Sequence, residues 1–497
     1  MNKNFQFLIF NFKSFKSQKG VLLIPIIIFS SVAIVIMGGI ISWTKITIEA
    51  NRQLITRENA IQLAEAGIDY YRWHLAHNQT DYQDGTGASG PYTHNVEDKN
   101  GDIKGQFKLN IIPPISGSTK VRIESTGIPS GSSVERTIRV EMAIPSLAKY
   151  AVAANDTMRF GEGTEIFGPV HSNKGIRFDG LAHNTISSAI SYYDDPDHEE
   201  SGAEKVEFAV HTHVNPPPGT GVNNNWRPSE APPNSVPTRT DIFEIGRIFP
   251  VPAIDFTGIT NDLSNIKSDA QENGKYFASS GAQGYQIILK TNDTFDVYKV
   301  TSQTNPPNRC TNVSDQTGWN TWSINNRQFV GNYAIPGNGL VFVEDNVWVQ
   351  GEINSARITI AAGRFPDNPS NRPQITINND LVYANYDGTD VVSLISQGNI
   401  NVGLISDTNL RIDAALVSQN GRVGRYYYES DCGSSYVRVS ITLYGMIASN
   451  SRYGFAYTDG TGYQTRNIIY DANLLYGPPP SFPLTSDQYE ILSWEEI

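Results

Sequence analysis

The carboxylates most able to do chemistry gather in the segment "YYDDPDHEE" (192–200). They are Asp194, Asp195, Asp197, Glu199 and Glu200. Glycoside hydrolysis requires two carboxylates held at a defined separation across a groove, and calcium requires several oxygen ligands around one point. These side chains instead crowd one loop around Pro196. We therefore interpret the segment as a solvated acidic loop rather than as a catalytic pair or a calcium site.

A second candidate is the pair His211 and His213, which lie two residues apart. Imidazole is a frequent zinc ligand, but we find no acidic or cysteine partner at the spacing of known zinc sites. We therefore expect a surface pair and no metal site. No G-x-S-x-G, H-E-x-x-H or phosphate-binding glycine loop occurs in the chain. The sequence predicts no catalytic residue, no cofactor and no enzyme activity.

The only two cysteines, Cys310 and Cys432, lie 122 residues apart. Their small number excludes a disulfide-rich scaffold and a cysteine-based zinc cluster. Outside the cell an oxidising environment would allow them to form one disulfide. The alternative, two separate thiols, stays open at this point.

Length and charge narrow the classes of protein further. The 497 residues are enough for two to four domains, and the formal net charge of −12 argues against nucleic acid as a partner. Gly, Asn, Ser and Tyr are abundant, and charged residues make up only 18%. This composition is typical of an extracellular, β-rich protein.

The amino-terminal region predicts a membrane helix. Four lysines and no acidic residue precede an uncharged stretch from residue 21 to 44. A helix of that length crosses a hydrocarbon core of about 30 Å. The lysines place residues 1–20 in the cytoplasm and the rest of the chain outside. A cleaved secretory signal fits less well, because its apolar region is shorter, about 7–15 residues, and a small-x-small cleavage site follows it.

The helix is expected to continue beyond the membrane to about residue 78. Apolar or small residues recur at helical spacing at Ala50, Leu54, Ile61, Ala64, Ile68, Tyr71 and Leu75. Four strand-like runs follow within residues 92–143, and Asn100-Gly101 between the first two predicts a hairpin turn. A long helix covering a four-stranded antiparallel sheet is the expected architecture. The apolar stripe by itself would also fit a single-span membrane protein with a coiled coil next to the membrane.

The segment "KGVLLIPIII…ENAIQLAEAGIDYYRWHLA" resembles the amino-terminal region of PilX-type minor pilins of type IV pili and of the large tip pseudopilin of type II secretion. The resemblance covers about residues 15–145. It implies that a prepilin peptidase cuts after Gly20, that Val21 becomes an N-methylated amino terminus, and that other pilins are the partners of the helix.

Two residues depart from the pattern of this family. Val21 stands where Phe or Met is usual, and Pro25 stands where the family carries a glutamate. A glutamate buried in lipid needs a partner charge, which the amino terminus of a neighbouring subunit is thought to supply. The absence of this carboxylate favours a subunit at the tip or start of a filament. Pro25 itself costs little in a first helical turn, where its missing N–H would have no partner.

Beyond residue 146 short strands recur between Gly and Asn turns. The related segments are "PVHSNKGIRFDG" (169–180), "SLISQGNINVG" (393–403), "ALVSQNGRVG" (415–424) and, more loosely, "GMIASNSRYG" (445–454). Repeated short strands with polar turns are typical of a β-solenoid, a parallel β-helix in which each coil buries its face against its neighbours. The spacing of the copies is irregular, so a β-sandwich remains the alternative.

The expected fold class is therefore α+β, mainly β. The expected parts are a leader (1–20), a pilin-like module (21–145), a β-solenoid-like domain (146–190 and 336–480), an inserted α+β and Pro-rich region (191–335) and a C-terminal tail (481–497). Within the insertion we expect a short helix beginning near Asp262 or Ser264 and ending before Gly274. A hairpin over "YQIILKTNDTFDVYKVTS" follows that helix.

Three functions fit this organisation. The first is a structural minor pilin that carries a large exposed β domain. The second is a surface adhesin that uses the pilin helix as its anchor and binds a surface glycan or protein. The third is a membrane-anchored, carbohydrate-active enzyme, for which no catalytic residues are found. The expected location is a single-pass membrane protein with an extracellular carboxyl-terminal domain, at the cell surface or in a pilus (fimbrium) after assembly.

Overall fold

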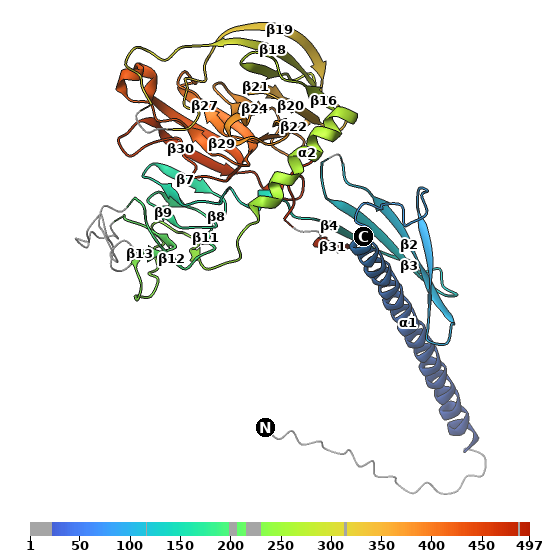
Figure 1. Ribbon diagram of the computed structural model, residues 1–497. Coiled ribbons are helices and arrows are strands. Elements are labelled where there is room, and N and C mark those ends of the chain that lie inside the picture. The colour runs from blue at the N-terminus through green and yellow to red at the C-terminus, as the bar shows by residue number, and fades with distance from the viewer. Residues whose placement is uncertain (1–21, 116, 198–205, 215–229, 313–315, 486–487) are drawn as a thin grey trace.

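The computed structural model describes residues 22–115, 117–197, 206–214, 230–312, 316–485 and 488–497, and side chains 257–262 are not described. A long helix leads into a small antiparallel sheet, and a large domain rich in β-strands follows (Figure 1). Gly20 and Val21 lie outside the described residues.

Helix α1 spans Leu23–His77, 55 residues without a break. Its first half has only uncharged residues up to Thr44, and its one proline, Pro25, lies in the first turn, where a missing N–H leaves no helical hydrogen bond unmade. Its second half carries the predicted stripe. Ala64, Ile68, Tyr71 and Leu75 are buried as expected, whereas Ala50 and Leu54 are exposed.

The sheet beside α1 has five strands in the order β1-β2-β3-β4-β31, all antiparallel. The strands are β1 (Tyr92–Glu97), β2 (Ile103–Ile112), β3 (Val121–Pro129), β4 (Arg136–Ala143) and β31 (Glu490–Glu496). The four strands predicted between residues 92 and 143 are all present. The predicted C-terminal tail is wrong, because its last residues form β31 and pair with β4.

Helix α1 packs on this sheet at very short range. A Cβ atom added to Gly127 of β3 would lie 2.0 Å from the Ala60 carbonyl oxygen, and one added to Gly67 would lie 2.2 Å from Ser125 Oγ. The two glycines therefore allow the helix and the sheet to approach more closely than side chains would permit. Around them, alternate residues of β2, β3 and β4 fill the core of the module.

The large domain is organised around one continuous ladder of parallel strands. In spatial order these are β16 (Lys275–Phe277), β20 (Leu340–Val343), β22 (Arg357–Ala362), β25 (Val391–Ser396), β27 (Asn409–Ser418), β29 (Val437–Ser449), β5 (Val152–Ala154), β8 (Val170–Ser172), β11 (Ile186–Ser188) and β15 (Arg247–Ile248). The first strands of the domain, β5 and β8, therefore stack next to the late strand β29. The two end strands of the ladder, β15 and β16, both belong to residues 190–335.

Further strands extend this sheet or form two smaller ones. Those of the large sheet are β7 (Thr164–Phe167), β10 (Leu181–Ala182), β17 (Gly284–Leu289), β18 (Thr294–Gln303), β19 (Ile324–Ala334), β21 (Val347–Ile353), β23 (Ile375–Thr376), β24 (Leu381–Tyr383), β26 (Ile400–Val402), β28 (Val423–Arg425) and β30 (Gly462–Tyr470). The smaller sheets contain β12 (Tyr192–Asp194) with β13 (Val206–Phe208), and β14 (Val210–His211) with β9 (Ile176–Phe178) and β6 (Met158–Phe160).

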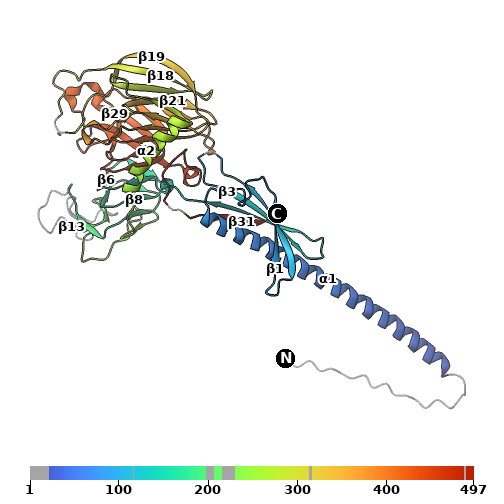
Figure 2. The same ribbon diagram turned by 45° about the vertical axis from the view of Figure 1, so that its right-hand side comes forward.

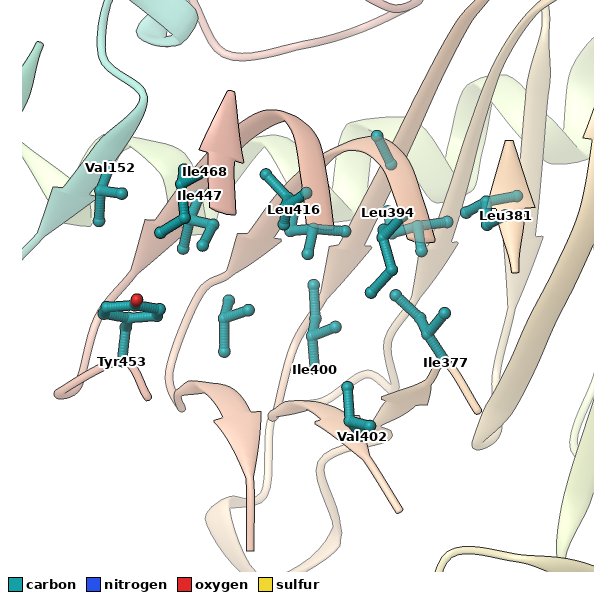
Figure 3. Packing of buried hydrophobic residues seen from close by; sticks show 14 of the residues in the cluster. Val152, Ile377, Leu381, Leu394, Ile400, Val402, Leu416, Ile447, Tyr453 and Ile468 are labelled. Carbon is teal, nitrogen blue, oxygen red and sulfur yellow. The ribbon is translucent and has the colours of Figure 1, made fainter. Parts of the chain in front are cut away.

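The segments that the sequence identifies as repeats lie in matching register. Leu394 pairs with Leu416, Leu416 with Ile447, Ile447 with Val152 and Val152 with Val170. Figure 3 shows the first four of these side chains in one row across neighbouring strands. All five are buried, so each coil covers the apolar face of the next.

The predicted insertion is not a separate unit. Its strands β16 and β17 pair in parallel with β20 and β21 of the large sheet. The predicted hairpin is present as β17–β18, and β19 adds to it in antiparallel register. The predicted helix starts earlier than expected, as α2 (Phe256–Glu272), and its Leu263 and Ile266 pack over the parallel strands.

Two segments join the β domain to the small sheet, because the chain leaves at β4 and returns to β31. They run side by side: the Leu147 N–H donates to the Pro483 carbonyl (2.9 Å), and Ser146 Oγ donates to the Leu474 carbonyl (2.8 Å). Residues 144–489 are thus an elaboration set between two neighbouring strands of the small sheet. Figures 1 and 2 show this elaboration at the end of the sheet away from the first half of α1.

Candidate functional site

The first candidate is the amino-terminal half of α1. It is the one described helix long and apolar enough to cross a membrane, and none of its most apolar window is buried. Leu22, Ile27, Phe29 and Trp43 are all more than half exposed. So many large apolar side chains side by side favour a non-aqueous environment, either lipid or the apolar surface of another protein.

Pro25 lies in the first turn of α1, and the structure has no acidic residue in that turn. The helix also begins without a side-chain cap at Leu22. The first turn of α1 therefore carries no carboxylate. The expected processing residues Gly20 and Val21 come directly before this turn, outside the described part.

Cys310 and Cys432 are joined by a disulfide. Both are buried in a cluster with Trp322, Trp348 and Tyr428. The bond ties the loop after β18 to the short 3-10 turn that precedes β29. It therefore fastens the segment between β18 and β19 to the side of the parallel stack.

The interpretation of His211 and His213 as a surface pair is wrong. His211 is 0% exposed and His213 5%, and both meet Glu207, which is also 0% exposed. The distance from His211 Nε2 to Glu207 Oε2 is 2.7 Å, and that from His213 Nε2 to the same oxygen is 2.8 Å. Asp195, 1% exposed, completes the group with Oδ2 3.4 Å from His211 Nε2.

We call Asp195, Glu207, His211 and His213 the histidine–carboxylate cluster. Each can offer one nitrogen or oxygen ligand atom, and these atoms lie within 4.8 Å of one another. The antiparallel β12–β13 pair supplies the two carboxylates, because Asp195 follows β12 and Glu207 lies in β13. His211 ends β14, which is anchored to β9 in the neighbouring sheet. The interpretation of residues 192–200 as a solvated acidic loop therefore fails at Asp195, whereas Glu199 and Glu200 lie outside the described residues.

Charge dominates the cluster. Burial alone would lower the pKa of His211, but the adjacent carboxylates of Asp195 and Glu207 outweigh it and raise that pKa to about 9. Burial opposes ionisation of Glu207, yet the two imidazoles lower its pKa to about 2. The pKa of Asp195 is well below its usual value despite burial, chiefly because of His211.

A cavity of about 950 Å³ opens beside this cluster. Asp197 and His213 form part of its wall. The arginines on the wall are Arg159, Arg177, Arg422, Arg452 and Arg466. The carboxylates on it are Glu162, Asp179 and Asp197, so the formal charges of these side chains leave an excess of cations in a chain that is acidic as a whole.

Ion pairs fix several of these side chains. Arg452 Nη2 lies 2.6 Å from Asp197 Oδ2, and Arg177 Nε lies 2.7 Å from Asp179 Oδ2. Arg159 is less well matched, with Nη1 4.0 Å from Asp197 Oδ1. Burial and the nearby Arg177 lower the pKa of Arg159. An anion entering the cavity would offset the repulsion between the positive charges of Arg159 and Arg177.

The cluster and the cavity were both missed from the sequence. A usable signal exists in "EFAVHTH" (207–213), where Glu207 precedes His211 by four residues and His213 by six. The five cavity arginines are spread over some 300 residues and share no motif. Only the stacking of early strands on late ones brings them together.

Comparison with known proteins gives little further information. No protein-family model matches the chain, and no curated protein matches it. Among solved structures, the competence-associated pilin ComZ from Thermus thermophilus aligns over 89% of this chain and 98% of its own, with 12% identity and a TM-score of 0.30.

Proposed function

We propose that this chain is a structural, minor pilin-like subunit of a type IV pilus or related secretion filament, located at the tip or start of the filament. The observation that carries the proposal is α1, a single helix whose first half exposes apolar side chains and whose second half packs on an antiparallel sheet. One element then serves as membrane anchor before assembly and as contact with neighbouring helices after it.

The position of the β domain supports a terminal location. Residues 144–489 are set between β4 and β31, at the end of the sheet away from the apolar half of α1 (Figure 2). Subunits that stack through their helices need this end free for the subunit above. A domain of this size occupies that space, so it is compatible with the end of a filament and incompatible with a closely packed shaft.

The start of α1 supports the same location. A repeating subunit needs its helix to contact neighbours on both sides, and the carboxylate that would receive the neighbour's amino terminus is replaced by Pro25. A subunit with no neighbour above it loses nothing by this replacement.

We infer that the parallel strands of the large domain form a β-solenoid. The in-register ladder of aliphatic residues and the repeated turns, in which Ser precedes a pair containing Asn or Gly, support this assignment over a β-sandwich. A sandwich stacks two sheets of mostly antiparallel strands. In this proposal the domain is non-catalytic and its role is display at the cell surface, outside the membrane.

The processing of the amino terminus tests the proposal. Mass spectrometry of the mature protein from cells with an active prepilin peptidase should give a chain beginning at Val21, with one added methyl group. Gly20→Leu should retain the leader. An intact leader on the wild-type chain in such cells would reject the pilin-like assignment and leave a plain membrane-anchored surface protein.

A second candidate function, adhesion, is favoured by the arginine-lined cavity. Its size is within the range of small-molecule sites, and the half-buried Tyr457 on its wall adds an aromatic side chain to the arginines. An acidic glycan is the ligand that this charge suits. Binding of the full chain to a panel of sulfated and sialylated glycans, lost in Arg422→Gln, would support adhesion; equal binding to neutral glycans would reject it.

A further inference from the structure

The histidine–carboxylate cluster places four ionisable side chains together inside the protein, which is unusual for a core held by hydrogen bonds alone. Asp195 directly follows β12, Glu207 lies in β13, His211 ends β14 and His213 lies two residues beyond it. All four are at least 95% buried. Buried ionisable groups are costly unless each is paired, and pairing needs correct hydrogen-bond direction as well as proximity.

Two polar atoms of the cluster do not have a correctly directed hydrogen bond. Within the part of the chain that the structure describes, Asp195 Oδ2 and His211 Nε2 are buried and have no hydrogen-bond partner of acceptable geometry. They nevertheless point into the same small space, 3.4 Å apart, and His211 Nε2 lies 2.7 Å from Glu207 Oε2. Atoms so placed have the arrangement of ligands around a common centre.

Hydrogen bonds on the outer side of these residues turn the remaining nitrogen and oxygen atoms toward the centre of the cluster, as in metal sites. His211 Nδ1 lies 3.0 Å from the Phe208 carbonyl oxygen, so it carries the proton and donates it there, which leaves Nε2 free to face the cluster. Asp195 Oδ1 accepts the Asp197 N–H at 3.0 Å, which leaves Oδ2 on the inner side. A backbone carbonyl behind a ligand histidine is the usual support in metalloproteins.

Distances and charge agree with a divalent cation. Around a tetrahedral zinc ion with ligands at about 2.0–2.1 Å, ligand atoms lie about 3.3 Å apart. The separations of 2.7, 2.8 and 3.4 Å differ from this value by at most about 0.6 Å. All four candidate ligand atoms lie within 4.8 Å of one another, so modest side-chain shifts would bring them around one ion. Two carboxylates, two neutral imidazoles and a divalent ion give zero net charge. Without the ion, the same residues bury an excess negative charge even with His211 protonated.

We propose that Asp195, Glu207, His211 and His213 form a structural site for a divalent transition metal, with zinc as the best fit. Four protein ligands close the coordination sphere, which is the arrangement of a structural rather than a catalytic zinc. The ion would fasten the β12–β13 pair to β14 and so fix the wall of the arginine-lined cavity at His213. Two imidazoles and two carboxylates suit zinc better than calcium or magnesium, which prefer oxygen ligands alone.

The test uses the full chain, purified in detergent without a polyhistidine tag and stripped with a chelator. The wild-type protein, dialysed against zinc and then against metal-free buffer, should retain one zinc per chain by elemental analysis. Glu207→Gln and His213→Gln should each weaken zinc binding by at least about tenfold. His183→Gln is the matched control, because His183 pairs with Glu244 (2.8 Å) and no third candidate metal ligand joins them among the described residues.

Thermal unfolding gives a second readout on the same samples. Zinc should raise the melting temperature of the wild-type and His183→Gln proteins and leave that of Glu207→Gln unchanged. Wild-type protein that retains no zinc above the buffer blank would overturn the proposal and leave a metal-free ion network. Zinc retained equally by Glu207→Gln and His213→Gln would overturn it too.

If the variants do not fold, X-ray absorption on zinc-loaded wild-type protein decides. Two imidazole ligands with the remainder oxygen would support the site. A first shell of oxygen alone, or of more than two imidazoles, would overturn it.

Discussion

At the scale of single residues, Asp81 shows how one carboxylate secures the end of a long helix. Its side chain accepts the Gln83 N–H at 2.8 Å and the Gly85 N–H at 2.7 Å, and it meets His74 Nε2 at 3.0 Å. These contacts, led by the Gln83 hydrogen bond, lower the pKa of Asp81. Because the folded-state pKa is depressed, the stabilisation is present above the unfolded pKa near 3.9 and is lost as the pH falls through the folded value.

We therefore expect Asp81→Asn to destabilise the α1–sheet module by about 1–2 kcal/mol at pH 7. The difference from wild type should shrink as the pH falls below about 4. Urea unfolding at pH 7, 5 and 3, followed by a probe in this module, measures both effects. A difference that stays constant over this range would show that the charge of Asp81 is not the cause.

The disulfide gives a second residue-scale prediction. Cys310 and Cys432 close a loop over a sequence separation of 122, which restricts the unfolded chain strongly. Replacing both with Ser should lower the free energy of unfolding by about 2–5 kcal/mol. Denaturant unfolding of the wild-type protein with reductant should approach the double variant. Equal stability of all three samples would contradict this expectation.

The sequence predicted the residues of local patterns better than those of distant contacts. The buried stripe of α1 follows from helical spacing, so Ala64, Ile68, Tyr71 and Leu75 could be chosen in advance. The histidine–carboxylate cluster could not, because it depends on which strand lies opposite Glu207 and on how β14 joins β9. Spacing along the chain does not contain that information.

At the scale of elements, the contact between α1 and β3 depends on Gly127. A Cβ atom there would meet the Ala60 carbonyl oxygen at 2.0 Å and the Ala64 nitrogen at 2.5 Å, and neither backbone atom can move without displacing the helix. Gly127→Ala should therefore cost about 1–3 kcal/mol through overpacking.

Thermal unfolding of Gly127→Ala measures this cost. Gly161→Ala is the control, because a Cβ atom at Gly161 meets nothing within 4 Å. If the two variants melt at the same temperature, α1 does not approach β3 as closely as described.

Strand β31 is the other element with a testable role. It pairs with β4 through Glu490–Glu496 and closes the sheet from which residues 144–489 depart. A chain ending at Thr485 should leave the β4 edge unpaired, lower the melting temperature and favour association through that edge. Light scattering and thermal unfolding of the truncated chain test this. A monomeric, equally stable product would show that β31 is dispensable.

Element prediction succeeded where pattern and pairing are local. The helix, the four consecutive strands and the β17–β18 hairpin were found from periodicity and turn residues. The repeats also pointed to strands that stack in register. β31 was missed because its sequence carries no clear strand pattern, and only its pairing with the distant strand β4 identifies it as a strand. The same reason explains why β16–β19 were set apart from the sheet they extend.

At the scale of the whole molecule, the chain combines a thin helical end with a large β domain at the opposite end (Figures 1 and 2). In the proposed filament, helices such as α1 pack side by side, and a repeating subunit would have to leave room for the next one. The β domain leaves none at the end of the sheet. The proposal therefore predicts that the protein is scarce relative to a smaller pilin of the same cell.

The most direct test of the proposed tip position is the location of the β domain on filaments. Gold-labelled antibody against the β domain should be imaged by electron microscopy on sheared filaments from cells that express the chain. The account predicts label at one end of each filament, or at the cell-proximal base complex alone. Label spread densely along the shaft would contradict it, because a subunit that repeats along the shaft could not carry this domain at its stacking end.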